Sequence, residues 1–160
     1  MTIRVGTAVR GIAPILLSIA VAGCVGDDDA TMDDTDAGTA SAPISPAPSV
    51  TITAPAEGDT VPAASLTVRL DVGGGLGIVM AGDTTPNTGH HHLFLDRDVT
   101  SPEIPIPAEP GFIVHMGDAS ATYTFENVAP GEHRLIAVVG DALHFPLQPW
   151  VVDTVRFVVR

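Results

Sequence analysis

Histidines are the residues of this sequence whose type and spacing could do chemistry, and three of them, His90, His91 and His92, are consecutive. Side chains alternate between the two faces of a strand, so His90 and His92 share one face and His91 lies on the other. Leu93 and Leu95 mark the core side, which predicts that His90 and His92 face outward. Two residues along a strand span about 6.6 Å, close enough for both imidazoles to reach one metal ion.

Three further histidines come from other segments of the chain and could complete a metal site with this pair. Imidazole nitrogens suit Cu(II), Zn(II) and Ni(II), and the single cysteine of the chain is remote in sequence. We therefore predict a site for Cu or Zn with four ligands: His90, His92, His115 and His144. Three carboxylates are candidate oxygen ligands, or partners that orient a ring N–H: Asp96, Asp118 and Asp141.

The other two histidines are predicted to be structural. His91 lies on the core face, and His133 shares a face with Leu135 in an apolar strand, where hydrogen-bonded histidines are more common than ligands. A run of three histidines is also compatible with a plain polar strand edge. Met80 and Met116 leave open a Cu(I) site with a thioether ligand, although we expect both side chains in the core.

Motifs of common catalytic sites are missing from the sequence. It contains no Gly-x-Ser-x-Gly elbow and no His-Glu-x-x-His pair. The Gly-rich residues 73–77 are not followed by a helical pattern whose N-terminus could hold a phosphate. We therefore predict that the protein is not an enzyme.

The segments that must position the histidines have the period of β-strands. Apolar and polar residues alternate over residues 50–54, 66–72 and 154–160, as in strands with one buried face. Residues 135–139 are apolar on both faces, which predicts a central, covered strand. The Pro-rich residues 100–111 predict a long surface loop.

Residues 50–160 therefore predict an all-β domain, an immunoglobulin-like two-sheet sandwich of about seven or eight antiparallel strands. It would be a variant without a disulfide, because the chain has one cysteine. Trp150 is the only tryptophan and follows a proline, and we expect it to anchor a loop into the core.

Short motifs around the histidines resemble those of a small bacterial family of unknown function, secreted or lipid-anchored and marked by a Gly-His-His-His-Leu strand. The matching segments are residues 89–96 (GHHHLFLD), 115–117 (HMG), 130–135 (PGEHRL) and 140–146 (GDALHFP). The resemblance runs from about residue 62 to the C-terminus and implies a β-sandwich domain without an assigned role.

Two positions depart from the pattern of that family. Residues 117–120 read Gly-Asp-Ala-Ser where a Gly-x-Gly-Gln-Ser/Thr-like segment is expected, and Leu147 stands where a second histidine is common. If that histidine is a ligand in relatives, the site of this chain is weaker or differently composed.

Residues 1–23 have the three parts of a secretory signal, with Arg4 and Arg10 ahead of the uncharged residues 11–22. That run is shorter than the roughly 20 apolar residues that span a bilayer. Small residues lead into Cys24, which resembles the bacterial lipobox. The resemblance implies cleavage before Cys24 and attachment of lipid to it.

The remaining boundaries follow from composition. Residues 24–49 begin with the lipidated Cys24 and continue as an Asp-rich and then Ala/Ser/Pro-rich stretch, which predicts a disordered linker. Residues 50–160 form the β-sandwich domain.

The charge of the chain limits its partners. The net charge is −12 and no residue is lysine, which argues against nucleic acid and against binding to anionic headgroups, so the lipid alone would contact the membrane. We predict an exported lipoprotein of the cell envelope, facing the periplasm or the cell exterior, that binds a transition metal. The alternative is a non-catalytic interaction or structural module that binds an envelope protein or polymer.

Overall fold

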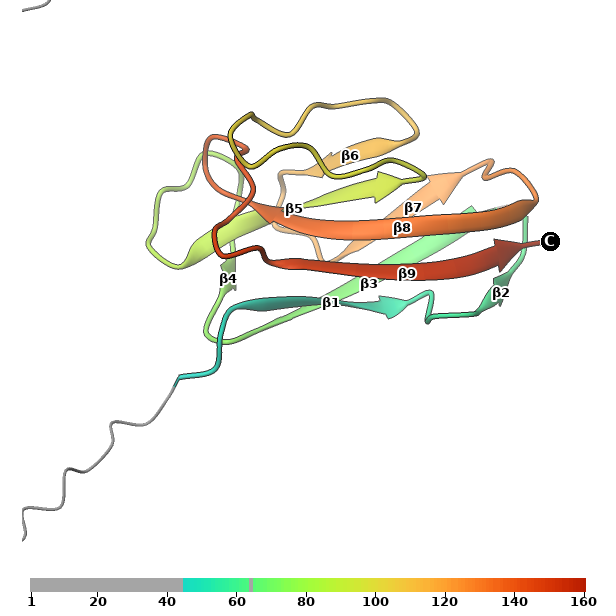
Figure 1. The fold of residues 1–160 in the computed structure, drawn as a ribbon, viewed down its shortest axis with the longest axis horizontal. Helices are drawn as coiled ribbons and strands as arrows, with labels where there is room; N and C mark the ends of the chain where they lie inside the picture. Colours follow the sequence, from blue (N-terminus) through green and yellow to red (C-terminus); the bar gives the residue numbers. More distant parts are fainter. Residues whose placement is uncertain (1–44, 64) are drawn as a thin grey trace, which may run out of the picture. The chain divides into compact units, whose positions relative to one another are not determined.

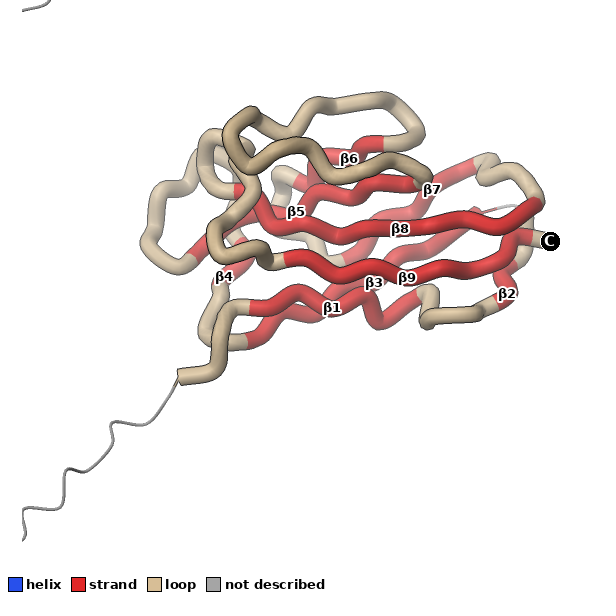
Figure 2. The backbone as a smooth tube through the Cα atoms, viewed as in Figure 1, coloured by secondary structure: helices blue, strands red, loops and turns tan. Residues whose placement is uncertain are grey.

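Strands alone make up the regular secondary structure of residues 45–63 and 65–160, which the computed structural model describes (Figures 1 and 2). The strands are β1 (Ser49–Ala54), β2 (Thr60–Val61), β3 (Ser65–Gly73), β4 (Gly77–Ile78), β5 (Thr88–Leu95), β6 (Ile113–Met116), β7 (Thr122–Glu126), β8 (Gly131–Gly140) and β9 (Val152–Val159). The prediction of an all-β domain is confirmed. The predicted signal sequence and most of the predicted linker lie outside the described residues.

The strands form two sheets. One has three strands in the order β1-β3-β7, and the other has six, in the order β2-β9-β8-β5-β4 with β6 paired to β5. Figure 1 shows β5, β8 and β9 side by side in the larger sheet. The pairs β2–β9 and β4–β5 are parallel, so the prediction of antiparallel strands throughout is wrong at these two short pairs.

The alternation of apolar residues in the sequence corresponds to one-sided burial in the structure. In β1, Val50 and Ile52 are buried and their neighbours are exposed, and β3 follows the same period. In β8, residues 135–140 are all buried, which confirms the prediction of a covered strand. Strand β8 lies between β5 and β9, and it therefore has a neighbour on both edges as well.

The main core lies between the two sheets. It is built from the inward residues of both, including Val68 and Phe125 of the smaller sheet and Leu93, Leu135 and Phe157 of the larger one. Burial of such side chains is the principal stabilising contribution to a domain that has no disulfide.

A second, smaller core covers the opposite face of the larger sheet. Residues 96–112 join β5 to β6 and place Ile106 against Phe94, Ile136 and Val138. The predicted Pro-rich surface loop is thus largely exposed but is held to the sheet by one buried isoleucine. Figure 1 shows this long connection passing over β5.

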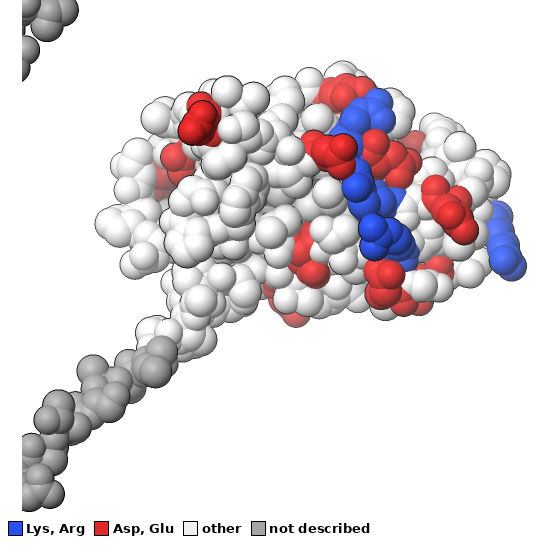
Figure 3. Space-filling view, in the orientation of Figure 1, with Lys and Arg blue, Asp and Glu red and all other residues white. Residues whose placement is uncertain are grey.

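Some of the charged side chains form exposed pairs. On the face drawn in Figure 3, arginine side chains form a band with acidic side chains on either side. Arg97 is 2.6 Å from Glu109, and Arg134 is 2.6 Å from Asp98. Exposed pairs of this kind contribute little to stability, so the band adds little to the stability of the fold. No helix among the described residues has the length and apolarity that a membrane crossing requires.

Candidate metal centre

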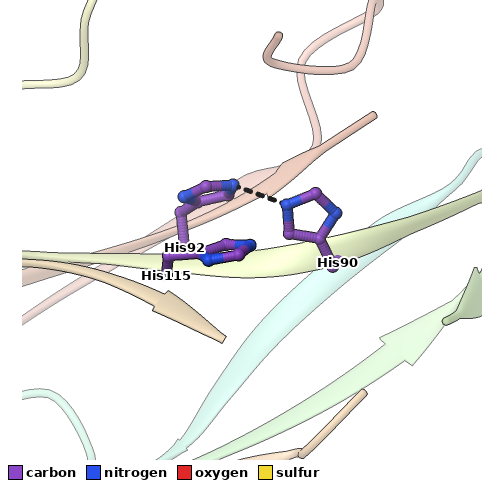
Figure 4. A group of neighbouring side chains, drawn as sticks. All are labelled: His90, His92 and His115. Carbon is purple, nitrogen blue, oxygen red and sulfur yellow. Dashed lines mark hydrogen bonds between the residues drawn. The ribbon is translucent and has the colours of Figure 1, made fainter. Parts of the chain in front are cut away.

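His90 and His92 lie on β5, in the interior of the larger sheet, and are each only 1% exposed. The expectation that they face outward to solvent is wrong, because residues 96–112 and 141–150 cover the face onto which Phe94 also points. Their Nε2 atoms are 3.0 Å apart, and Figure 4 shows the two rings turned toward each other.

His115 comes from β6, the neighbouring strand. The antiparallel register places it directly opposite His92, so the two side chains share a face of the sheet. Their ring centroids are 5.2 Å apart, and the ring of His115 lies beside those of His90 and His92 in Figure 4. Unlike the two histidines of β5, His115 is exposed.

His144 comes from the turn that follows β8, with a backbone φ of +69°, which is uncommon for a residue other than glycine. Asp141 builds this turn, since its Oδ1 accepts the backbone N–H groups of Leu143 and Phe145 at 2.8 and 2.9 Å. The carbonyl of His144 accepts the N–H of Ile106 at 2.8 Å. The Nε2 of His144 is thereby placed 3.2 Å from Nε2 of His115.

The structure thus brings together all four histidines that the sequence predicts as ligands. Every pair of their ring centroids is between 4.6 and 5.6 Å apart. One ring nitrogen from each of His90, His92 and His115 lies within 4.8 Å of the others, and this group could hold a metal ion.

The two short nitrogen–nitrogen distances match the spacing of ligands on one ion. Ligands about 2.05 Å from a metal are about 2.9 Å apart at a right angle and about 3.4 Å apart at the tetrahedral angle. The separations of 3.0 Å and 3.2 Å fall between these values. Either pair could therefore bind one ion with little movement of its rings.

Burial keeps the two inner histidines uncharged. Burial, together with repulsion from the other rings of the cluster, lowers the pKa of His92 to about 3 and the pKa of His90 to about 4. The pKa of His115 is also lowered, first by burial and then by His144. A neutral imidazole has a free lone pair, so at neutral pH these rings are in the form that binds metals.

Two glycines make room for the rings. A Cβ at Gly117 would lie 2.5 Å from Cε1 of His115, and a Cβ at Gly140 would lie 3.0 Å from Nε2 of His92. Neither glycine was predicted from the sequence as part of the site. Their position in the sequence could have indicated them, since Gly117 and Gly140 both lie in the motifs that carry the family resemblance.

The three predicted carboxylates have different positions. Asp141 lies close enough to the cluster for its charge to offset a small part of the lowering of the His90 pKa that burial causes, while its Oδ1 holds the turn. Asp118 accepts the N–H of Ser120 at the rim. Asp96 bonds elsewhere, to Nδ1 of His133 at 2.7 Å and to the N–H of Arg134 at 2.9 Å.

The two histidines predicted to be structural lie outside the cluster. His133 stacks on Phe157 and also bonds the carbonyl of Ala129, so both of its ring nitrogens have partners. His91 is 1% exposed on the main-core side, and its Nδ1 has no hydrogen-bond partner. The Nδ1 of His92 has none either, whereas a histidine ligand usually donates this second N–H to a protein group.

Two expectations about large apolar side chains are wrong. Met116 is buried in the main core as expected, but Met80 is 66% exposed, because it lies after β4 at an isolated bridge to Asp118 and not within a sheet. Trp150 is 41% exposed and does not anchor its loop, and Val151 is buried in its place.

The chain is thus an all-β protein with a partly buried histidine cluster, and it belongs to the family described as a domain of unknown function, DUF4399. The family model matches residues 68–160, which include all four clustered histidines. No curated protein matches the chain. Among solved structures, an engineered protein from a structural genomics consortium is similar with a TM-score of 0.39 and 18% identity, over 71% of this chain and 20% of that one.

Proposed function

We propose that this protein binds one transition-metal ion, Cu(II) or Zn(II), through the Nε2 atoms of His90, His92, His115 and His144. The observation that carries the proposal is the convergence of two close Nε2 pairs, at 3.0 and 3.2 Å, from three separate segments of the chain. Four imidazole rings facing one another have few hydrogen-bond donors to share, and a cation at their centre would satisfy their lone pairs.

The ligand set favours copper or zinc over other ions. Imidazole nitrogen is a borderline donor that suits Cu(II) and Zn(II), whereas Ca²⁺ and Mg²⁺ prefer oxygen. The thioether alternative has little support, because Met116 points into the main core. We propose no catalytic role for the ion.

The fold type that we propose for the domain is an immunoglobulin-like sandwich. In that fold, strands A, B and E pair in one sheet and strands C, F and G in the other. The order β1-β3-β7 in one sheet and β9-β8-β5 in the other follows this scheme when these six strands alone are lettered A, B, C, E, F and G in chain order, with β2, β4 and β6 left out. Such a sandwich presents loops at its ends, and the turn that carries His144 is one of them.

The proposed place of action is the cell envelope, where the chain would be anchored by lipid on Cys24 and would contact no nucleic acid. The support is the order of features in the sequence: two arginines, an uncharged stretch, small residues and a lone cysteine. Incorporation of a labelled fatty acid into the wild-type chain, and none into Cys24→Ala, would support this anchor. Equal labelling of the two chains would refute it.

Titration of the purified protein with Cu(II) and with Zn(II), followed by calorimetry and by thermal melting, tests the proposed metal site. We expect one ion to bind and to raise the melting temperature, because the ion binds the folded state only. The double variant His90→Ala/His92→Ala should lose both effects, and His133→Ala, which removes a histidine outside the cluster, should keep them. Binding that is equal in the wild type and the double variant would refute the proposal.

A non-catalytic interaction module is the second candidate function. It is favoured by three exposed apolar side chains near the histidine end of the domain, Met80, Leu143 and Trp150. If no metal binds, this candidate becomes the working hypothesis, with an envelope protein or polymer as the partner.

A further inference from the structure

The histidine cluster is closed on one side and open on the other. His90 and His92 are 1% exposed beneath residues 96–112, whereas His115 is exposed and His144 is half-buried. Sites that hold a metal permanently are closed by four fixed ligands, while sites that exchange a ligand keep one position accessible. The difference in burial therefore indicates that an ion or a ligand would enter and leave the cluster from the side of His115.

His115 is also the least firmly held of the four. It lies on β6, a strand of four residues at the edge of the sheet that pairs only with β5. His144 is fixed by the hydrogen bonds of Asp141 and by the bond between its carbonyl and Ile106. A ligand on a short edge strand can turn away from an ion at a lower cost than a ligand in a fixed turn.

A pocket of about 260 Å³ opens directly beside His115. Its lining consists of His115, Met116, Gly117, Asp118, Ser120, Thr122 and Tyr123. This volume is sufficient for a molecule of a few heavy atoms. The carboxylate of Asp118 is the charged group of this lining, so it favours a neutral or cationic occupant over an anionic one.

We infer that this pocket admits a small nitrogen-donor ligand, neutral or cationic, which replaces His115 on the bound ion and so makes the centre an exchange site. The inference rests on the proposed metal binding and adds to it the route and the class of the exchanging ligand. The incoming amine nitrogen forms its bond as the bond from the ion to Nε2 of His115 breaks. The oxidation state of the ion is unchanged, and any proton lost by the amine passes to solvent.

The rate of metal transfer from the loaded protein to ethylenediamine, a small amine, tests the inference by stopped-flow absorbance with Cu(II). If the amine enters before the ion leaves, the rate rises in proportion to the concentration of ethylenediamine. A rate that stays constant as ethylenediamine increases would mean that the ion leaves first, and it would overturn the inference while leaving metal binding intact. Failure of Cu(II) and Zn(II) to bind at all would overturn both.

A variant that fills the pocket tests the route. Thr122→Trp places a large side chain in the lining, and we expect at least threefold slower transfer with an unchanged affinity for Cu(II). Thr124→Trp is the matched control, two residues further along β7 and outside the pocket, and it should leave the rate unchanged. Equal rates in Thr122→Trp and the wild type would overturn the inference.

A charge variant covers the case in which Thr122→Trp fails to fold. Asp118→Asn keeps an oxygen for the N–H of Ser120 and removes the negative charge. Wild-type protein should transfer Cu(II) to ethylenediamine faster than to citrate at equal concentration, and the variant should reduce this ratio at least twofold. An unchanged ratio would show that the ligand does not pass Asp118, which would overturn the inference.

Discussion

The backbone of Gly140 lies against the ring of His92, so that a Cβ at position 140 would be 3.0 Å from Nε2 of His92. Gly140 ends β8, pairs with His90 across the sheet and precedes the turn that carries His144. We predict that Gly140→Ala displaces the His92 ring by a few tenths of an ångström and weakens metal binding about tenfold, because ligand nitrogens tolerate little displacement. Calorimetric titration of the variant measures the affinity.

Gly73→Ala is a suitable control for this substitution. Its Cβ would also be too close to a neighbour, at 2.8 Å from Oγ of Ser49, but between β1 and β3 and not at a histidine of the cluster. It should lower the melting temperature and leave the metal affinity unchanged. If Gly140→Ala bound metal as tightly as Gly73→Ala, the position of the His92 ring would not depend on its close contact with Gly140.

The buried histidines predict how the stability of the metal-free protein depends on pH. Burial lowers the pKa of His91 to about 4 and the pKa values of His90 and His92 to about 4 and 3, from 6.5. Between pH 6.5 and about 4, the unfolded chain therefore binds protons that the folded chain does not. The free energy of unfolding should be constant above pH 6.5 and fall as the pH decreases through this window, as measured by urea unfolding at fixed pH values.

His91→Leu isolates one of these histidines. The substitution removes a buried ring whose Nδ1 has no partner and should reduce the slope of stability against pH by about 1.4 kcal/mol per pH unit, the value for one proton. At pH 7 the variant should be at least as stable as the wild type, because no hydrogen bond of this nitrogen is lost. A slope equal to that of the wild type would show that His91 is already protonated in the folded state.

The sheets were predictable because their signal is local. Alternation over two residues follows from the geometry of a strand, and it identifies β1, β3 and β9 without any knowledge of their partners. The continuous apolar run of β8 likewise reflects burial on both faces. The two short parallel pairs, β2–β9 and β4–β5, involve strands of two residues each, which are too short to show a period.

The covering of the cluster was not predictable in the same way. Leu93 and Leu95 correctly indicate one core face of β5, but the burial of His90 and His92 depends on residues 96–112 and 141–150, which cover the other face and show no strand period. The position of Asp96 was missed because β5 ends at Leu95. With a φ of +53°, Asp96 no longer follows the alternation that would place it with His90 and His92.

Asp141 is predicted to act through its hydrogen bonds and not as an oxygen ligand. Asp141→Ala removes the acceptor for the N–H groups of Leu143 and Phe145, so His144 should lose its position and metal affinity should fall about tenfold. Asp141→Asn keeps an acceptor oxygen and should retain most of the affinity. A loss as large in Asp141→Asn as in Asp141→Ala would instead point to a role for the charge.

Residues 96–112 form the loop that covers the cluster, and Ile106 is the residue that holds this loop to the sheet. Ile106 is 6% exposed and packs on Phe94, Ile136 and Val138, whereas Ile104, two residues earlier in the same loop, is 50% exposed. Ile106→Ala should lower the free energy of unfolding by about 2–4 kcal/mol, the usual cost of truncating a buried isoleucine. Ile104→Ala should change it by less than about 0.5 kcal/mol, because surface substitutions have small effects.

Metal exchange gives a second measurement on the same two variants. The N–H of Ile106 donates to the carbonyl of His144, so loss of the isoleucine side chain should loosen both the cover of His90 and His92 and the turn of His144. Transfer of Cu(II) to ethylenediamine should then accelerate in Ile106→Ala and not in Ile104→Ala. If Ile106→Ala lost stability with no change in exchange, the cover would stabilise the sheet alone, and the ion would be held independently of the loop.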